Sequence, residues 1–265
     1  MIETLRRLWR SRALVWVLAR RELKARYRGS ALGFLWSLVN PLLLLAIYSA
    51  VFTLVFVQRA EGLHPYPLFL FGGVLAWNFF AASLVDASQT FRNNGPLLRK
   101  VIVSPEIFPG VSVVAQAFHL ALALPVLFAA TAVAVAAFSG RIGWTVVQIV
   151  PVLLLLSVAA LGAALFVSAV SVHFQDLRDL LQSFLTFWFF ATPIIYSLDA
   201  IPPRLRPWIR ANPATAFFVG VHDALFHDRW TGARDWAAMA AAAAASLALG
   251  AWTFSRLRES IAEEA

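Results

Sequence analysis

Long stretches without a charged residue alternate with short charged segments along the whole chain of 265 residues. The uncharged stretches cover residues 29–58, 62–85, 107–140, 142–175, 180–198 and 236–255. A helix rises 1.5 Å per residue and needs about 20 apolar residues to cross the hydrocarbon core of a bilayer. Each stretch reaches that length or comes within one residue of it. We therefore predict one transmembrane domain over residues 1–265, with six spanning helices at approximately 32–58, 66–90, 111–138, 145–172, 180–198 and 236–255.

The segment 1–28 is predicted to form an amphipathic helix at the membrane surface. Apolar residues such as Trp9 and Trp16 fall on one side of this helix, whereas most of the arginines lie elsewhere. That pattern is typical of an interfacial helix whose basic face meets anionic headgroups. Trp9, Trp16, Tyr27 and Arg28 are its candidate interface residues. A basic topological anchor with no further role accounts for the pattern equally well.

A shorter uncharged stretch covers residues 211–222, within the connection 199–233 before the last predicted span. Its 12 residues are too few to cross a bilayer. A lipid environment tolerates such a segment only where protein or water covers its backbone. We therefore expect a re-entrant or interfacial segment there.

Composition agrees with an integral membrane protein. Hydrophobic residues make up 60% of the chain and charged residues only 14%, with a mean hydropathy of +0.74. Soluble domains carry about 25% charged residues. The chain contains 10 Trp, 4 Tyr and 22 Phe, side chains that favour membrane interfaces. It contains no cysteine, which excludes disulfides, thiolate metal sites and a cysteine nucleophile.

The basic residues predict the orientation of the chain. Six spans place both termini on the same side of the membrane. The segments on that side hold 15 Lys and Arg residues, nine of them before residue 29, and the segments on the opposite side hold seven. The positive-inside rule therefore places both termini in the cytoplasm.

No catalytic or metal-binding constellation is present in the sequence. The two lysines, Lys24 and Lys100, do not follow a glycine, so the chain has no phosphate-binding P-loop. Asp86, at the end of the second predicted span, is a poor candidate for an ion-coupling carboxylate. His222 and His227 are spaced too far apart on a helix for a metal pair, and we expect both to be solvent-exposed. The sequence thus predicts no enzyme and no metal site.

Two cytoplasmic segments are candidate docking sites for a cytosolic partner. Residues 92–110 combine turn signals with a short amphipathic run, and residues 173–182 place charges between apolar residues. Capped helix ends without a partner are the simpler alternative. The candidate contact residues are Leu98, Arg99, Lys100, Asp176, Arg178 and Asp179.

Several short motifs follow one another along the chain. The most specific is the run YRGSALGFLW at residues 27–36, followed by Asn40-Pro41-Leu42. Weaker ones come later: LRKV with Ser104-Pro105-Glu106, then PIIY at 193–196, then Asn212-Pro213. In this order they resemble the permeases of ABC-2-type polysaccharide exporters, which serve O-antigen, capsule and teichoic-acid chains. One departure is Gln175 before Asp176, where the family often has an Arg-Asp pair.

The resemblance implies a six-span permease that works as a homodimer with two copies of a separate ATP-binding subunit. ATP and Mg would be bound by that partner, so no cofactor is expected in this chain. The segments 92–110 and 176–179 would receive nucleotide-driven movement, and re-entrant helices within 199–233 would gate the outer mouth. The expected location is the bacterial cytoplasmic (inner) membrane, with membrane lipid and polysaccharide as further partners and no nucleic acid.

Aromatic side chains are the candidate lining of a polysaccharide channel, because sugar rings present apolar C–H faces that stack on aromatic rings. A lipid-facing position or an interface belt accounts for any single one of them equally well. The candidates are Trp36, Tyr48, Trp77, Phe79, Phe187, Trp188 and Tyr196.

Three alternatives to polysaccharide export remain, the first within transport and the other two in different classes of function. The six-span plan also suits an ABC-2-type permease for a drug or a lipid. A membrane-embedded glycolipid-modifying enzyme would need a catalytic cluster, and the acidic residues are too scattered for one. A passive channel would need charged or polar rings along a pore, and the predicted spans lack charged residues for them.

Overall fold

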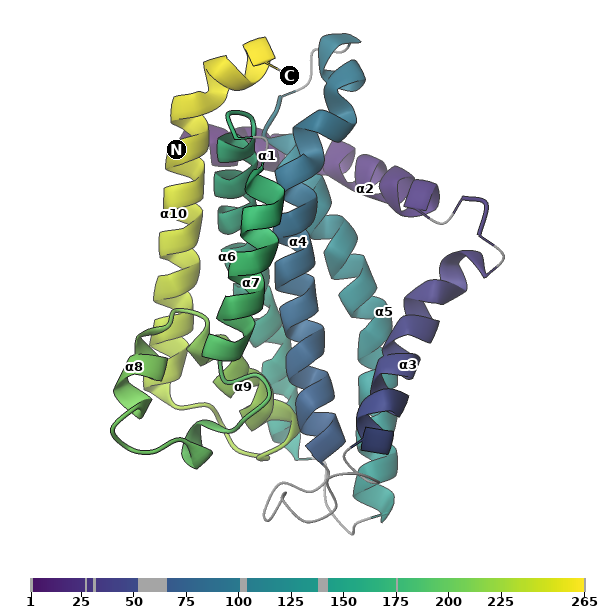
Figure 1. Cartoon of the computed structure of the whole chain (residues 1–265), viewed down its shortest axis with the longest axis vertical. Helices are drawn as coiled ribbons and strands as arrows, with labels where there is room; N and C mark the ends of the chain where they lie inside the picture. The colour runs from purple at the N-terminus through teal and green to yellow at the C-terminus, as the bar shows by residue number, and fades with distance from the viewer. Residues whose placement is uncertain are drawn as a thin grey trace.

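The computed structural model of the chain describes residues 2–26, 28–30, 32–51, 66–100, 104–137, 143–174 and 176–264. These residues form an elongated bundle of helices, and no β-strand occurs among them (Figure 1). Four helices in the described part are long and apolar enough to cross a membrane. They are α4 (Tyr66–Lys100), α5 (Ile107–Ala137), α6 (Ile149–Ser171) and α10 (Ala233–Glu264). The prediction of an all-helical, multi-pass membrane protein is confirmed.

Two shorter helices, α3 (Trp36–Ala50) and α7 (Leu177–Ala191), have 15 residues each and correspond to the predicted spans 32–58 and 180–198. Residues 52–58 of the first prediction lie outside the described residues. Helix α7 ends seven residues before the predicted end of its span, because Thr192 is extended, with φ −107° and ψ 140°. Thr192 precedes a proline, and the proline ring disfavours helical geometry in the residue before it.

Both ends of the described chain lie at the same end of the bundle (Figure 1). Helices α1 (Ile2–Arg10) and α2 (Arg12–Arg26) run across that end rather than along the bundle. The predicted interfacial segment is therefore two helices. Trp9 and Trp16 are 70% and 49% exposed, and Arg28 is exposed as well. Tyr27 lies outside the described residues.

The connection 199–233 folds at the opposite end of the bundle (Figure 1). It contains α8 (Arg206–Ala211) and α9 (Thr215–Leu225), preceded by a short 3₁₀ turn at Leu198–Ala200. Two further 3₁₀ turns, Gly33–Leu35 and Trp144–Gln148, precede α3 and α6. Helix α9 packs against α4, α6 and α10, and ten of its eleven residues are buried.

The prediction that His222 is solvent-exposed is wrong. His222 is only 5% exposed, and its imidazole stacks on Phe69 with the two ring centroids 3.7 Å apart. The reason is the depth at which α9 enters the bundle, which places every face of this short helix against protein. Gly73 leaves the space for the imidazole, because a Cβ there would lie 3.0 Å from His222 Nε2.

Helices α6 and α10 cross with their backbones in close contact. A Cβ on Gly250 would lie 1.9 Å from the carbonyl oxygen of Gly162, so only glycine fits at this crossing. Ser246 strengthens the contact by donating a hydrogen bond of 2.7 Å from its hydroxyl to the carbonyl oxygen of Ala159. Small residues that admit a neighbouring backbone are typical of membrane helix pairs.

Candidate functional site

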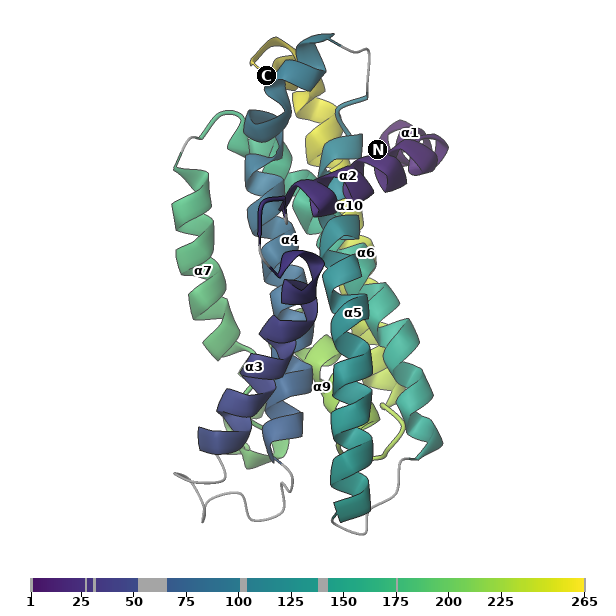
Figure 2. The same cartoon turned by 90° about the vertical axis from the view of Figure 1, so that its right-hand side faces the viewer.

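A polar cleft of about 580 Å³ lies between the C-terminal end of α2 and helices α3, α4 and α5. Figure 2 shows α3 alongside α4 and α5 on this side of the bundle. The amides of Asn40, Asn78 and Gln116 line the cleft together with the imidazole of His119. Planar amides and an imidazole in an otherwise apolar bundle provide donors and acceptors for a polar ligand.

Helical periodicity explains why these side chains meet. Residues spaced three, four and seven positions apart share one face of a helix, and each helix contributes such a stripe to the cleft. The stripes are Ser37, Asn40, Pro41 and Leu44 on α3; Leu75, Asn78, Phe79 and Ala82 on α4; and Gln116, His119, Leu120 and Ala123 on α5.

Arg26 closes one end of the cleft, at the termini end of the bundle. Its Nη2 lies 2.9 Å from Asp86 Oδ2 and 3.5 Å from Glu22 Oε1, so one guanidinium joins two carboxylates. The side-chain amide of Gln116 donates a second hydrogen bond of 2.5 Å to Asp86 Oδ2. Burial raises the pKa of the Glu22 carboxyl, the nearby charge of Asp86 raises it further, and the charge of Arg26 opposes both.

A second cavity of about 390 Å³ lies on the other side of Arg26, between α2, α4 and α5. Arg26 borders both spaces and therefore forms the wall between them. The second cavity, unlike the first, has a mostly polar lining. Its polar and charged lining residues are Arg21, Glu22, Arg26, Asp86, Gln89, Thr90, Asn93, Asn94, Ser112 and Arg178.

The residues predicted to contact a cytosolic partner lie at the termini end of the bundle. Leu98, Arg99 and Lys100 occupy the last turn of α4, and their side chains are outside the described part of the structure. Asp176, Arg178 and Asp179 stand exposed at the start of α7. The two groups belong to the same end of the molecule (Figure 1), although Arg178 also borders the second cavity.

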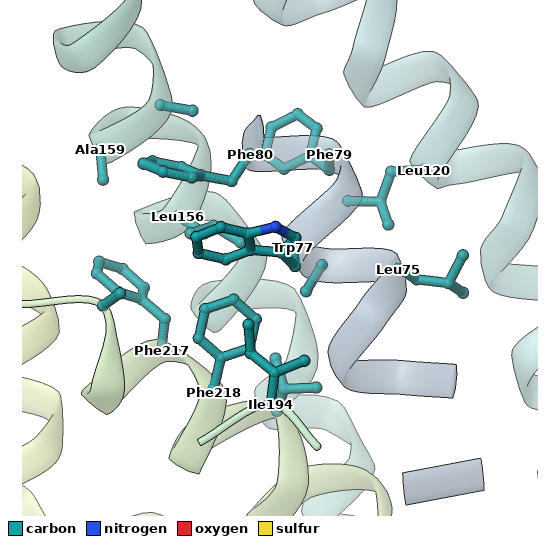
Figure 3. Packing of buried hydrophobic residues seen from close by; sticks show 14 of the residues in the cluster. Leu75, Trp77, Phe79, Phe80, Leu120, Leu156, Ala159, Ile194, Phe217 and Phe218 are labelled. Carbon is teal, nitrogen blue, oxygen red and sulfur yellow. The ribbon is translucent and has the colours of Figure 1, made fainter. Parts of the chain in front are cut away.

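Of the predicted channel aromatics, the structure brings Trp36 and Phe79 to the polar cleft. Trp77 points instead into the protein core and is 5% exposed. Figure 3 shows its ring between Phe80 and Phe218, each with a ring centroid 5.9 Å from that of Trp77. Trp188 packs edge-on against Trp77 at the same distance.

The three remaining aromatics are scattered. Tyr48 is partly buried against the core, and Phe187 on α7 is 71% exposed. Tyr196 is half-buried, and its hydroxyl donates a hydrogen bond of 3.0 Å to the carbonyl oxygen of Phe190. These seven residues therefore do not form one continuous surface within a single chain.

Asn78, Gln116 and His119 were not among the predicted site residues, because the prediction considered only charged and aromatic side chains. A usable signal was present, since isolated amide and imidazole side chains are costly within a membrane-spanning helix unless they have partners. For metals, no group of three or more His, Asp or Glu side chains within the described ranges is arranged to hold an ion.

Comparisons of the sequence with known proteins find similarity to a transporter family. The profile of the ABC-2 type transporter membrane domain matches residues 13–226. An "O-antigen export system permease protein RfbA" of Myxococcus xanthus is 32% identical over 265 residues, which is 99% of each chain. A Klebsiella pneumoniae protein of the same name is 28% identical over 211 residues, or 79% of each chain.

Proposed function

Because the chain belongs to the ABC-2 type transporter family, we propose that it is the membrane-spanning permease of an exporter that moves a polysaccharide such as O-antigen. The observation that carries this proposal is the match to an O-antigen export permease along 99% of both chains. An ATP-driven exporter places hydrolysis in a separate subunit. The chain is accordingly a transport subunit rather than an enzyme.

The proposed topology has six crossings, formed by the four long helices together with α3 and α7. The two shorter helices lie alongside the long ones in both views of the bundle (Figures 1 and 2). Both termini then lie in the cytoplasm, in agreement with the excess of basic residues at that end. The membrane is the bacterial cytoplasmic membrane, in which a lipid-linked chain is assembled on the inner face.

The polar cleft is the proposed path of the polysaccharide. Trp36 offers an aromatic face for sugar rings, and Asn40, Asn78 and Gln116 offer hydrogen bonds to hydroxyl groups, whereas Phe79 borders the cleft with a ring that is only 3% exposed. Single hydrogen bonds of this kind are individually weak, which lets a long polymer slide through without being held at one register.

The proposed complex contains two copies of this chain and two ATP-binding subunits. ATP and Mg bind to the partner, and the partner contacts this chain through Leu98–Lys100 and Asp176–Asp179. Support for this surface comes from its position at the same end as the basic α1–α2 segment (Figure 1). At the opposite end, α8 and α9 are the proposed re-entrant helices that gate the outer mouth.

Complementation of cells that lack the chain tests the proposal. Removing the gene should abolish surface polysaccharide and leave lipid-linked chains inside the cell, and the wild-type chain should restore export. Asn78→Leu should fail to restore it, because leucine removes a hydrogen-bonding group from the cleft and fills the space with apolar atoms. Gln182→Leu makes the same chemical change at an exposed position of α7 and should export normally.

Two results would contradict the proposal. Unchanged surface polysaccharide in the deletion strain, with altered drug resistance or lipid distribution instead, would favour the drug or lipid permease. Equal export by the Asn78 and Gln182 variants at equal protein level would remove the cleft from the transport path.

A further inference from the structure

Glu106, directly before the first residue of α5, is a buried carboxylate held by two arginines from distant parts of the chain. It is 1% exposed. Its Oε1 lies 3.3 Å from Arg258 Nε on α10 and 3.9 Å from Arg7 Nη1 on α1. Its Oε2 is buried without a hydrogen-bond partner in the described part of the chain. Arg7 also pairs with Glu3 at 3.3 Å, on the exposed side of α1.

The first turns of α5 are the point at which these elements meet. On one side, Ile107 and Val111 pack with Val15 and Ala19 of α2 in one apolar cluster, with Leu8 of α1 against it. A Cβ on Gly110 would lie 3.0 Å from Leu8 Cδ1, so α1 lies directly on α5.

On the other side of the same turn, Phe108 joins a second apolar cluster. It packs with Phe91 of α4 and Phe254 of α10, and all three rings are buried. Glu106 therefore lies where α1, α4, α5 and α10 converge. The residues proposed to contact the ATP-binding subunit, Leu98–Lys100, precede it by only six to eight positions in the chain.

We propose that Glu106 is a positioning residue that couples the partner-contacting end of α4 to the α1–α2 segment, by holding Arg7 and Arg258 at the start of α5. This inference rests on the proposed function, because the movement that it transmits originates in the ATP-binding subunit. The α1–α2 segment carries Arg26, which closes one end of the polar cleft. Glu106 thus connects ATP hydrolysis to the opening of the polysaccharide path.

Packing alone does not explain a carboxylate at this position. Burying a carboxylate costs free energy that ion pairs repay only when every oxygen is well partnered, and Glu106 Oε2 is not. A neutral isostere should therefore preserve the fold. The carboxylate adds ion pairs with Arg7 and Arg258, which fix the positions of two residues from opposite ends of the sequence relative to each other.

The test uses the complete exporter, purified as this chain with the P-loop subunit that copurifies with it. The variants are Glu106→Gln, the conservative Glu106→Asp, and the control Glu3→Gln, which removes the exposed carboxylate from Arg7 and leaves Glu106 intact. The measured quantity is polysaccharide exported per ATP hydrolysed. We expect Glu106→Gln to keep complex assembly and ATP hydrolysis while export falls about tenfold, the size of a typical coupling between sites. Glu106→Asp should recover part of the export, and Glu3→Gln should match the wild type.

A second measurement follows the α1–α5 contact without the partner. The chain contains no cysteine, so a cross-link formed between Leu8→Cys and Gly110→Cys has no background from other thiols. Adding Glu106→Gln should lower the fraction of chains that cross-link, and adding Glu3→Gln should not.

The outcomes separate the inference from the proposed function. If Glu106→Gln exports at the wild-type rate per ATP, or if assembly, hydrolysis and export all fall together, Glu106 is not a coupling residue. If no P-loop subunit copurifies with the wild-type chain, the proposed function fails and this inference fails with it.

Discussion

The indole nitrogen of Trp188 donates a hydrogen bond of 2.9 Å to the side-chain oxygen of Asn212, and this contact joins α7 to the turn between α8 and α9. Asn212 also donates to the carbonyl oxygen of Ala191 and to the hydroxyl of Thr192, at 3.2 and 2.9 Å. Its oxygen accepts a further bond of 3.0 Å from the backbone N–H of Ala214. One amide side chain thus fixes the end of a membrane helix against the start of the buried α9.

Removing this amide should destabilise the protein more than removing the indole donor. Asn212→Ala deletes four hydrogen bonds and should lower the free energy of unfolding by about 2 kcal/mol or more, whereas Trp188→Phe deletes one bond and should cost about 1 kcal/mol. Thermal unfolding of the detergent-purified protein measures both. Asn93→Ala, an exposed change on α4, serves as control. Equal melting temperatures for the Asn212 and Trp188 variants would show that the other three bonds contribute nothing.

The contact between α6 and α10 should not tolerate a methyl group. Gly250→Ala places a Cβ 1.9 Å from Gly162 O and forces the helices apart, which should cost about 1–3 kcal/mol or more. Gly232→Ala is the matched control, because no atom lies within 4 Å of its added Cβ. That variant should stay within about 0.5 kcal/mol of the wild type. Gel filtration and thermal unfolding report both effects, and comparable melting temperatures would refute the close approach.

Two of the predicted channel tryptophans should behave differently from each other. Trp77 is a core residue, so Trp77→Ala should lose about 3–5 kcal/mol of stability through the cavity that it leaves. Trp36 is 36% exposed and borders the cleft, so Trp36→Ala should keep its melting temperature near the wild-type value and still export poorly. Melting temperature and surface polysaccharide, measured on the same variants, separate the two roles. Loss of stability in both variants would argue against a lining role for Trp36.

Ionisation of Glu106 should contribute to the pH dependence of the protein's stability. Burial raises the pKa of its carboxyl above the ordinary 4.5, and the charge of Arg7 only partly opposes the shift. The folded chain therefore binds this proton more tightly than the unfolded chain. The contribution of this group to stability is fully present below pH 4.5 and is lost as the pH rises through the raised pKa.

Glu106→Gln should therefore gain stability relative to the wild type as the pH rises from 4.5, until the carboxyl is fully ionised. Melting temperatures of both proteins across this range measure the difference. Glu3→Gln serves as the matched control, because it makes the same chemical change at a side chain that is 62% exposed and leaves Glu106 in place. If the wild type instead becomes more stable than Glu106→Gln as the pH rises, the attraction of the two arginines for the Glu106 carboxylate exceeds the free-energy cost of burying it.

The class of protein followed from the sequence because it depends on local quantities. The length of uncharged stretches and the low content of charge identify membrane helices without reference to any contact. Residues that carry the family resemblance, such as Asn212, were also visible in the sequence. The physical role of Asn212 was not visible, since three of its four bonds lead to Trp188, Ala191 and Thr192, which lie 20 to 24 positions earlier in the chain.

Which residues of a membrane helix face the protein interior was harder to predict, because a helix that is apolar on all sides shows no preferred face. On α6, for example, Ala160, Ala164 and Ser168 are small residues spaced four apart, yet the backbone contact with α10 is made by Gly162. Eight of the eleven alanines of α10 whose burial the structure describes are exposed in a single chain, so only a narrow face of this helix packs against protein.

The sequence by itself determined that this protein lies in a membrane, that it is helical and which family it belongs to. Each of these properties depends only on composition, on the spacing of residue types and on local motifs. The tertiary structure decided which polar side chains share a cleft, which tryptophan is core and which is lining, and why Glu106 and His222 are buried. These properties depend on contacts between residues such as Arg7 and Arg258, which lie at opposite ends of the chain. No local pattern contains such contacts, since the free energy of a buried polar group is set by the neighbours that folding brings to it.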